Sequence, residues 1–315
     1  MGFDLSYDFA LRQWDANLRF ACGIGPALCA EEKQVMENLR GVLEKYGFRF
    51  KKQLGQNFLS DANLLRSVAD GAGTDGKTVV EIGCGAGTLT RALAERAKKV
   101  YAFDVDTDLK PVLAETLSGL ENVEVIFRDF LKIDLKAFEK EVGAYLVVAN
   151  LPYYITTPLV GRLLDESESC TGFSVMVQEE VAERFCAKAG TPEYGAITAA
   201  IALRGEAHIV RRVPRTMFHP RPNVDSAVVR VDFQPGRLGE KSAEMYRKTV
   251  RCAFAGRRKT LENNLVNGFA LSRERAKEIL RKAGVEEKAR GETLSPERFA
   301  RLSDVLYDEI GGETL

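Results

Sequence analysis

A short segment after an apolar run carries residues suited to holding a planar amine. The run 145–149 is followed by Asn150-Leu-Pro-Tyr153. The side-chain oxygen of Asn150 and the carbonyl oxygen of Leu151 can both accept hydrogen bonds, whereas Pro152 has no N–H to donate and stiffens the turn. Tyr153 can stack on a flat ring. The alternative interpretation is a strand-end turn with a surface tyrosine.

A glycine-rich loop follows an earlier apolar run. Gly83, Gly85 and Gly87 precede a helical pattern, and glycine there lets the backbone approach a ligand at the carboxyl end of a strand. Asp104 ends the next predicted strand, where a carboxylate can accept hydrogen bonds from ribose hydroxyls. Asp129 ends the third, where an acid can bind the amine of an adenine. Together these features favour an adenosine-containing cofactor over a tight turn and two helix caps.

A dinucleotide cofactor would use the same geometry. The loop begins Glu81-x-Gly rather than Gly-x-Gly-x-x-Gly, however, and the sequence offers no candidate for hydride transfer. A dehydrogenase is therefore the weaker interpretation.

The elements that must position these residues alternate regularly from residue 78. Short apolar runs alternate with helical segments, which is typical of a parallel sheet covered on both faces. The predicted strands are 78–82, 100–103, 123–127, 145–149, 173–177, 207–213 and 226–233, and the predicted helices are 31–46, 61–70, 89–97, 108–117, 135–141 and 158–164. Beyond a linker at 234–239 the chain is predicted to be helical, with Ser295-Pro296 opening one helix.

These patterns predict an α/β fold with a Rossmann-like sheet and a small all-helical C-terminal domain. We expect an N-terminal extension and helix at 1–47, the α/β domain at 48–235 and the helical domain at 236–315.

Composition excludes several classes of protein. The 315 residues are 45% hydrophobic and 29% charged, which excludes a mainly disordered or fibrous chain. The six cysteines form no C-x-x-C pair and there are only two histidines, so we expect free thiols and no metal site. No apolar run is long enough to span a bilayer, and acidic residues interrupt the N-terminus, which argues against a signal peptide. We therefore expect a cytoplasmic protein.

Zero formal net charge hides an asymmetry along the chain. Between residues 204 and 237 there are seven arginines and three acids, and between 240 and 290 there are fourteen basic residues and seven acids. This distribution favours a polyanionic partner met by one region. A solvated helical surface is the alternative.

Four segments together resemble the rRNA adenine dimethyltransferase family. They are Gln53-Leu-Gly-Gln-Asn-Phe-Leu59, the Glu81-x-Gly-x-Gly-x-Gly loop, Asn150–Tyr153, and Phe218-His-Pro-Arg-Pro-Asn-Val-Asp-Ser226. Segments 176–184 and 254–261 are most similar to the bacterial small-subunit branch. The resemblance implies transfer of methyl groups from S-adenosylmethionine to N6 of two adjacent adenosines in the 3′-terminal hairpin of 16S rRNA. It also implies action on the immature small ribosomal subunit, and we expect the protein to be a monomer.

The resemblance assigns roles to individual residues. The catalytic set is Asn150, Leu151, Pro152, Tyr153 and Phe218, with Tyr153 and Phe218 on either side of the flipped adenine. The set expected to contact the cofactor is Gln56, Asn57, Leu59, Gly83, Gly85, Asp104, Asp129 and Asn150. Their clustering, rather than the resemblance, gives the basic residues expected to track RNA phosphates: Lys51, Lys52, Arg211, Arg212, Arg221, Lys248, Arg251, Arg257, Arg258 and Lys259. For each arginine taken singly, a solvated surface position is the alternative.

The chain departs from the family pattern in four places. Asp104 replaces the more common Glu and reaches less far by one methylene. Cys84 stands where Pro is frequent, and Arg128 stands where Gly often precedes the acid. The fourth departure is the N-terminal extension.

Two other functions compete with this one. A 23S rRNA adenine N6-methyltransferase of the macrolide-resistance type shares the glycine loop and the Asn-Leu-Pro-Tyr type of motif, but the segment 257–260 and the C-terminal length argue against it. A ribosome assembly factor that only binds is a different class. Intact Asn150 and Tyr153 argue against that class.

Overall fold

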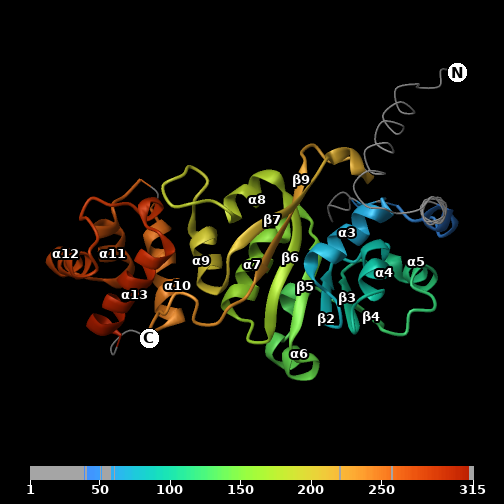
Figure 1. Cartoon of the computed structure of the whole chain (residues 1–315), viewed down its shortest axis with the longest axis horizontal. Coiled ribbons are helices and arrows are strands. Elements are labelled where there is room, and N and C mark those ends of the chain that lie inside the picture. The colour runs from blue at the N-terminus through green and yellow to red at the C-terminus, as the bar shows by residue number, and fades with distance from the viewer. Residues whose placement is uncertain are drawn as a thin grey trace, which may run out of the picture.

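A seven-stranded sheet forms the centre of the molecule (Figure 1). The computed structural model describes residues 39, 41–49, 51, 58–59, 61–219, 221–256 and 258–311, and of Phe58, Ala62, Tyr153 and His219 the backbone alone. The strands stand in the order β4-β3-β2-β5-β6-β9-β7. Their bounds are β2 (Thr78–Ile82), β3 (Lys99–Asp104), β4 (Val123–Phe127), β5 (Tyr145–Asn150), β6 (Cys170–Gln178), β7 (Ala207–Val213) and β9 (Ser226–Asp232).

The strand order places a crevice beside β2. From β2 the chain adds β3 and β4 on one side, and it then returns to add β5 and β6 on the other. All neighbours from β4 to β6 are parallel, whereas β9 pairs antiparallel with both β6 and β7. Where the order of a parallel sheet reverses, the loops at the carboxyl ends of the strands separate and leave room for a ligand.

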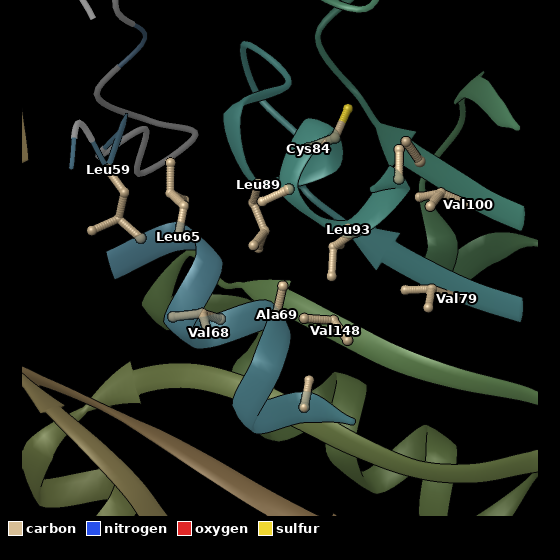
Figure 2. Packing of buried hydrophobic residues seen from close by; sticks show 14 of the residues in the cluster. Leu59, Leu65, Val68, Ala69, Val79, Cys84, Leu89, Leu93, Val100 and Val148 are labelled. Atoms are coloured by element: carbon tan, nitrogen blue, oxygen red, sulfur yellow. The ribbon is translucent and has the colours of Figure 1, made fainter. Parts of the chain in front are cut away.

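Helices cover both faces of the sheet because its strands are apolar on both sides. Val79 packs into one hydrophobic cluster and its neighbour Val80 into the other, as the alternation of side chains along a strand requires. The helices of the first face are α3 (Ala62–Ala72), α4 (Thr88–Ala94) and α5 (Lys110–Thr116), and those of the second are α6 (Leu135–Val142), α7 (Thr156–Asp165) and α8 (Glu179–Phe185). Figure 2 shows the first cluster, in which Leu65 and Val68 of α3 lie near Leu89 of α4 and Val148 of β5.

The C-terminal helices surround a hydrophobic core of their own at one end of the molecule (Figure 1). They are α10 (Ala243–Phe254), α11 (Leu261–Phe269), α12 (Arg273–Lys282) and α13 (Pro296–Ile310). This core also takes in Ala199 and Leu203 of α9 (Ala196–Arg204), whereas Ile201 of the same helix packs into the second cluster of the sheet. The hydroxyl of Tyr246 donates to the carbonyl of Ala199 at 2.9 Å, which ties α10 to α9.

The predicted α/β fold is confirmed, and most predicted elements occur within a few residues of their expected bounds. Strands 78–82, 123–127 and 207–213 match those of the structure. The predicted helix 108–117 begins as a 3₁₀ turn, η2 (Thr107–Leu109), and α8 and α9 were not predicted. Of the predicted helix 31–46, residues 39 and 41–45 are helical, Tyr46 and Gly47 form a turn, and the others lie outside the described residues. The domain boundaries stay a prediction.

The described chain shows neither a bilayer-spanning helix nor a disulfide. No helix in the described ranges has the length and apolarity that a membrane crossing requires. Cys84, Cys170, Cys186 and Cys252 are free thiols, and Cys22 and Cys29 lie outside the described residues.

Candidate active site

A cavity of about 700 Å³ opens at the edge of the sheet where β2, β3, β4 and β5 end. Gly83 and Gly85 line it after β2, Asp104 lines it at the end of β3, Asp129 after β4 and Asn150 at the end of β5. This is the edge at which parallel sheets of this order bind ligands. The cavity thus brings together the predicted cofactor residues that follow the strands.

The glycine loop turns sharply around the backbone of the neighbouring strand. Gly83 and Gly85 have φ values of +75° and +55°, a region that side-chain-bearing residues rarely occupy. The backbone N–H groups of Gly83 and Cys84 both donate to the carbonyl of Phe103, at 2.8 and 3.1 Å. The loop is therefore fixed against β3 before any ligand arrives.

Asp104 connects the glycine loop to the turn after β3. Its Oδ2 accepts from the N–H of Gly85 at 2.8 Å and its Oδ1 accepts from the N–H of Asp106 at 2.8 Å. Burial raises the pKa of Asp104, and the charge of Asp106 adds to the increase, while these backbone donors oppose it. Each oxygen keeps a further lone pair, so Asp104 can still accept from hydroxyls in the cavity.

Asp129 lies after β4, the strand next to β3, and caps a short turn. Its Oδ1 accepts from the N–H of Leu131 at 3.0 Å, at the start of η3 (Phe130–Lys132). Its Oδ2 is 3.3 Å from Nζ of Lys132. Arg128 is exposed and also lines the cavity. The residue where the family often has Gly therefore adds a positive charge to this rim.

The segment after β5 presents polar atoms to the cavity. Asn150 is partly buried, and Leu151 is held in place because its N–H donates to the carbonyl of Met176 at 3.3 Å. Pro152 then begins η4 (Tyr153–Ile155), and Asn150, Leu151 and Pro152 all line the cavity. The side chain of Tyr153 lies outside the described part of the structure.

A two-stranded ribbon brings two distant segments to the same wall. Strand β1 (Phe58–Leu59) pairs antiparallel with β8 (Phe218–His219), with Leu59 opposite Phe218. Both side chains are buried and both line the cavity. The structure therefore joins a predicted cofactor residue to a predicted base-stacking residue. Gln56 and Asn57 lie outside the described residues.

Glu81 is a cavity residue that was not predicted from the sequence. It is 1% exposed on strand β2, it lines the cavity, and its Oε2 has no hydrogen-bond partner among the residues that the structure describes. Burial raises the pKa of Glu81 to about 8, and the charge of Asp104 contributes to the increase, while the Thr90 hydroxyl opposes it. The available signal was a charged residue in the otherwise apolar run 78–82.

Two exposed apolar residues at the cavity were also missed. Val105 is 50% exposed and Tyr154 is 59% exposed, and both line the cavity. Their positions, one residue after Asp104 and one after Tyr153, are the signal that could have identified them.

Several predicted RNA-binding residues have partners within the protein. Nζ of Lys51 is 2.6 Å from a carboxylate oxygen of Asp106 and 2.6 Å from one of Asp108. Other cations pair as follows: Arg211 with the Ser67 hydroxyl, Arg212 with Glu179 and Glu183, Arg251 with Asp165, and Lys248 with the ring of Phe269. Because α7 starts at the cavity edge and ends at Asp165, the structure does not bring Arg251 to the cavity.

Three predicted RNA-binding residues remain exposed without an ion pair among the described residues. They are Arg221, Arg258 and Lys259. Arg221 follows the cavity residue Phe218 by three positions. Lys52 and Arg257 lie outside the described residues.

Comparison with known proteins supports one family over most of the chain. A family model described as ribosomal RNA adenine dimethylase matches residues 47–308. The ribosomal RNA small subunit methyltransferase A of Geobacillus thermodenitrificans is 48% identical over 274 residues, covering 84% of this chain and 94% of the relative. The protein of the same name from Bacillus mycoides is 49% identical over 277 residues, covering 85% and 94%.

Solved structures share the fold. The 23S rRNA methyltransferase ErmE is 30% identical, with a TM-score of 0.62 over 79% of this chain and 99% of its own. A dimethyladenosine transferase from Plasmodium falciparum has a TM-score of 0.68 at 24% identity, over 81% and 98%. These likenesses confirm the Rossmann-like arrangement of the sheet.

Proposed function

Because the chain belongs to the ribosomal RNA adenine dimethylase family, we propose that it dimethylates N6 of two adjacent adenosines in the 3′-terminal hairpin of 16S rRNA. The methyl donor is S-adenosylmethionine, as the family implies, and the substrate is the hairpin within the immature small ribosomal subunit. The protein acts as a monomer and needs no metal.

One observation carries this proposal. The glycine loop, Asp104, Asp129, Asn150, Leu151 and Phe218 all line a single cavity. A cofactor held by the glycine loop, Asp104 and Asp129 would meet, within this cavity, a base held by Asn150, Leu151 and Phe218. Contacts with these residues would keep both in a fixed orientation, which is the main requirement of a transfer between two bound groups.

The residues present fit the proposed donor. The ribose hydroxyls would find acceptors on Asp104, and the adenine amine would find one on Asp129. The unpartnered Oε2 of Glu81 would gain a donor from the cationic methionine end. Burying a carboxyl oxygen without a hydrogen-bond partner costs free energy. A bound ligand that donates a hydrogen bond to this oxygen would remove that cost.

The target amine needs help because its lone pair is delocalised into the adenine ring. The side-chain oxygen of Asn150 and the carbonyl of Leu151 would accept its two N–H bonds and favour a pyramidal nitrogen. S-adenosylmethionine supplies a methyl group on a cationic sulfur. Since the amine becomes strongly acidic as it is alkylated, water can remove the proton and no general base is required. Phe218 would stack on the flipped base, opposite Tyr153.

The two alternatives have less support. The small-subunit relatives are 48% and 49% identical, whereas ErmE is 30% identical. A binding-only assembly factor would have no use for the partly buried amide of Asn150 and the unpartnered carboxyl oxygen of Glu81 at the same cavity.

Methyl transfer to defined RNA species tests the proposal. Small subunits from a strain lacking the modification, and naked 23S rRNA, would be incubated with labelled S-adenosylmethionine and digested for mass spectrometry. We expect dimethyladenosine in the 16S 3′ hairpin alone. Product on 23S rRNA alone would move the protein to the resistance type, and binding to subunits without product on either RNA would leave an assembly factor.

A further inference from the structure

Arg162 connects two walls of the cavity from behind. It lies in α7 with its side chain 11% exposed. Its guanidinium donates to the carbonyl of Phe130 through one terminal nitrogen and to the carbonyl of Ile133, at 2.6 Å, through the other. Its Nε donates to Oε2 of Glu166 at 3.0 Å. Each of the three guanidinium nitrogens therefore donates one hydrogen bond to the protein.

The two carbonyls belong to the turn that forms the Asp129 wall. Phe130 and Lys132 of η3 line the cavity, and Ile133 follows directly. Without Arg162, the carbonyls of Phe130 and Ile133 would lose these donors, and buried carbonyl groups rarely stay unpaired.

Helix α7 itself forms the wall beneath the predicted amine site. It follows the segment Asn150–Tyr153 after the single turn η4, and Pro158 and Leu159 in its first turns line the cavity. Arg162 lies one turn farther along. It therefore joins the wall expected to face the cofactor adenine to the wall that carries the amine-binding segment.

We infer that Arg162 is a positioning residue that sets the separation between the cofactor end and the target-base end of the cavity. The inference rests on the proposed function. A guanidinium suits this task because its planar fork presents two parallel donors at a fixed spacing, whereas a lysine ammonium acts as a single point. Arg162 touches neither ligand, so it acts through η3 and α7.

The chain offers a matched control for the loss of a buried arginine. Arg204 is also partly buried and donates to carbonyls at the far end of α7, with Leu163, Leu164 and Ser167 at 3.3, 3.4 and 2.7 Å. Neither Arg204 nor these three residues line the cavity. Glu166→Gln is a second control, because it removes the ion pair of Arg162 and keeps both carbonyl contacts.

The experiment compares Arg162→Lys, Arg204→Lys and Glu166→Gln in the full-length chain. Titration calorimetry would give the dissociation constant of S-adenosylmethionine, and steady-state assays on small subunits would give kcat and the KM for each substrate. We expect Arg162→Lys to weaken S-adenosylmethionine binding about tenfold and to raise KM for S-adenosylmethionine more than it lowers kcat. The two controls should stay within twofold, even where thermal unfolding shows that Arg204→Lys is equally destabilised.

Two different failures can be told apart. If the wild type binds S-adenosylmethionine and Arg162→Lys binds it equally well, Arg162 has only a structural role and the inference is wrong. The same holds if Arg204→Lys weakens binding as much as Arg162→Lys does. If the wild type binds no S-adenosylmethionine, the proposed function fails and the inference fails with it.

Discussion

The raised pKa of Glu81 links the protonation of this residue to the stability of the fold. Its carboxyl group is buried at the cavity with one oxygen unpartnered, and its pKa is raised to about 8 from an ordinary 4.5. Between these two values the folded state holds a proton that the unfolded state releases. Stability contributed by this group is therefore present below pH 4.5 and is lost as the pH rises through 8. Each unit by which the pKa differs between the folded and unfolded states corresponds to about 1.4 kcal/mol in the free energy of unfolding.

Glu81→Gln should remove this pH dependence, because glutamine resembles the protonated acid at every pH. We expect the free energy of unfolding of the variant to exceed that of the wild type by a margin that grows between pH 6 and 8.5, as measured by urea unfolding. Over the same range the wild type should gain affinity for S-adenosylmethionine as the carboxylate forms, while the variant should not. Parallel pH profiles for the two proteins would contradict this role.

The glycine loop is held by elements on two sides. Ala86 packs with Val112 of α5 and with Leu39 and Leu43 from the N-terminal residues. Gly87 caps α4 with φ +81°, and a Cβ there would come within 2.9 Å of Leu117. The position of the loop therefore depends on close packing as well as on its own hydrogen bonds.

Gly87→Ala and Gly119→Ala separate the effect of close packing from that of backbone strain. Gly119 has nearly the same φ, +82°, but nothing lies within 4 Å of its Cβ position. We expect Gly119→Ala to cost about 1–2 kcal/mol from backbone strain alone. Gly87→Ala should cost more and should also weaken S-adenosylmethionine binding, as measured by urea unfolding and calorimetry. Equal effects of the two changes on both measurements would show that packing around Gly87 is unimportant.

At the scale of the whole molecule, internal ion pairs reduce the basic surface that the sequence indicates. Lys51, Arg212 and Arg251 all face carboxylates of the protein itself. Arg221, Arg258 and Lys259 are exposed, and none of them has an ion pair in the described part of the chain. We propose that these three carry much of the phosphate contact, which makes subunit binding dependent on salt.

Replacing all three by Ala should weaken subunit binding and lower the slope of log affinity against log salt by up to about 3, roughly one per lost contact. Affinity for S-adenosylmethionine should not change. The matched control is the triple variant Lys77→Ala, Lys98→Ala and Lys140→Ala. These three lysines are exposed and lie just before β2, just before β3 and near the end of α6, at the edge of the sheet opposite the cavity. An equal loss of slope in both triple variants would mean that binding depends on total charge alone.

The sequence predicts the elements whose pattern is local and misses those that depend on tertiary contacts. Strands such as Thr78–Ile82 are short apolar runs between turns, so they are evident. Helix α9 reads Ala-Ile-Thr-Ala-Ala-Ile-Ala-Leu-Arg, which is apolar on all sides because it packs between two cores, and it therefore lacks the helical period. The pairing of Leu59 with Phe218 joins segments far apart in the chain.

The same distinction applies to the site. Residues at strand ends, such as Asp104 and Asn150, were predicted because the ends of parallel strands share an edge. The unpartnered oxygen of Glu81 and the pairing of Lys51 with Asp106 depend on packing that no local pattern encodes.

The most direct test of the account uses Asn150→Ala with two readouts. Methyl transfer to unmodified small subunits would be measured with labelled S-adenosylmethionine, and subunit binding would be measured on the same preparation. We predict that transfer falls by at least about 100-fold, the usual effect of removing one group that stabilises a transition state, while the subunit dissociation constant stays within twofold. Transfer at the wild-type rate, or an equal loss of binding and transfer, would contradict the placement of the target amine at Asn150.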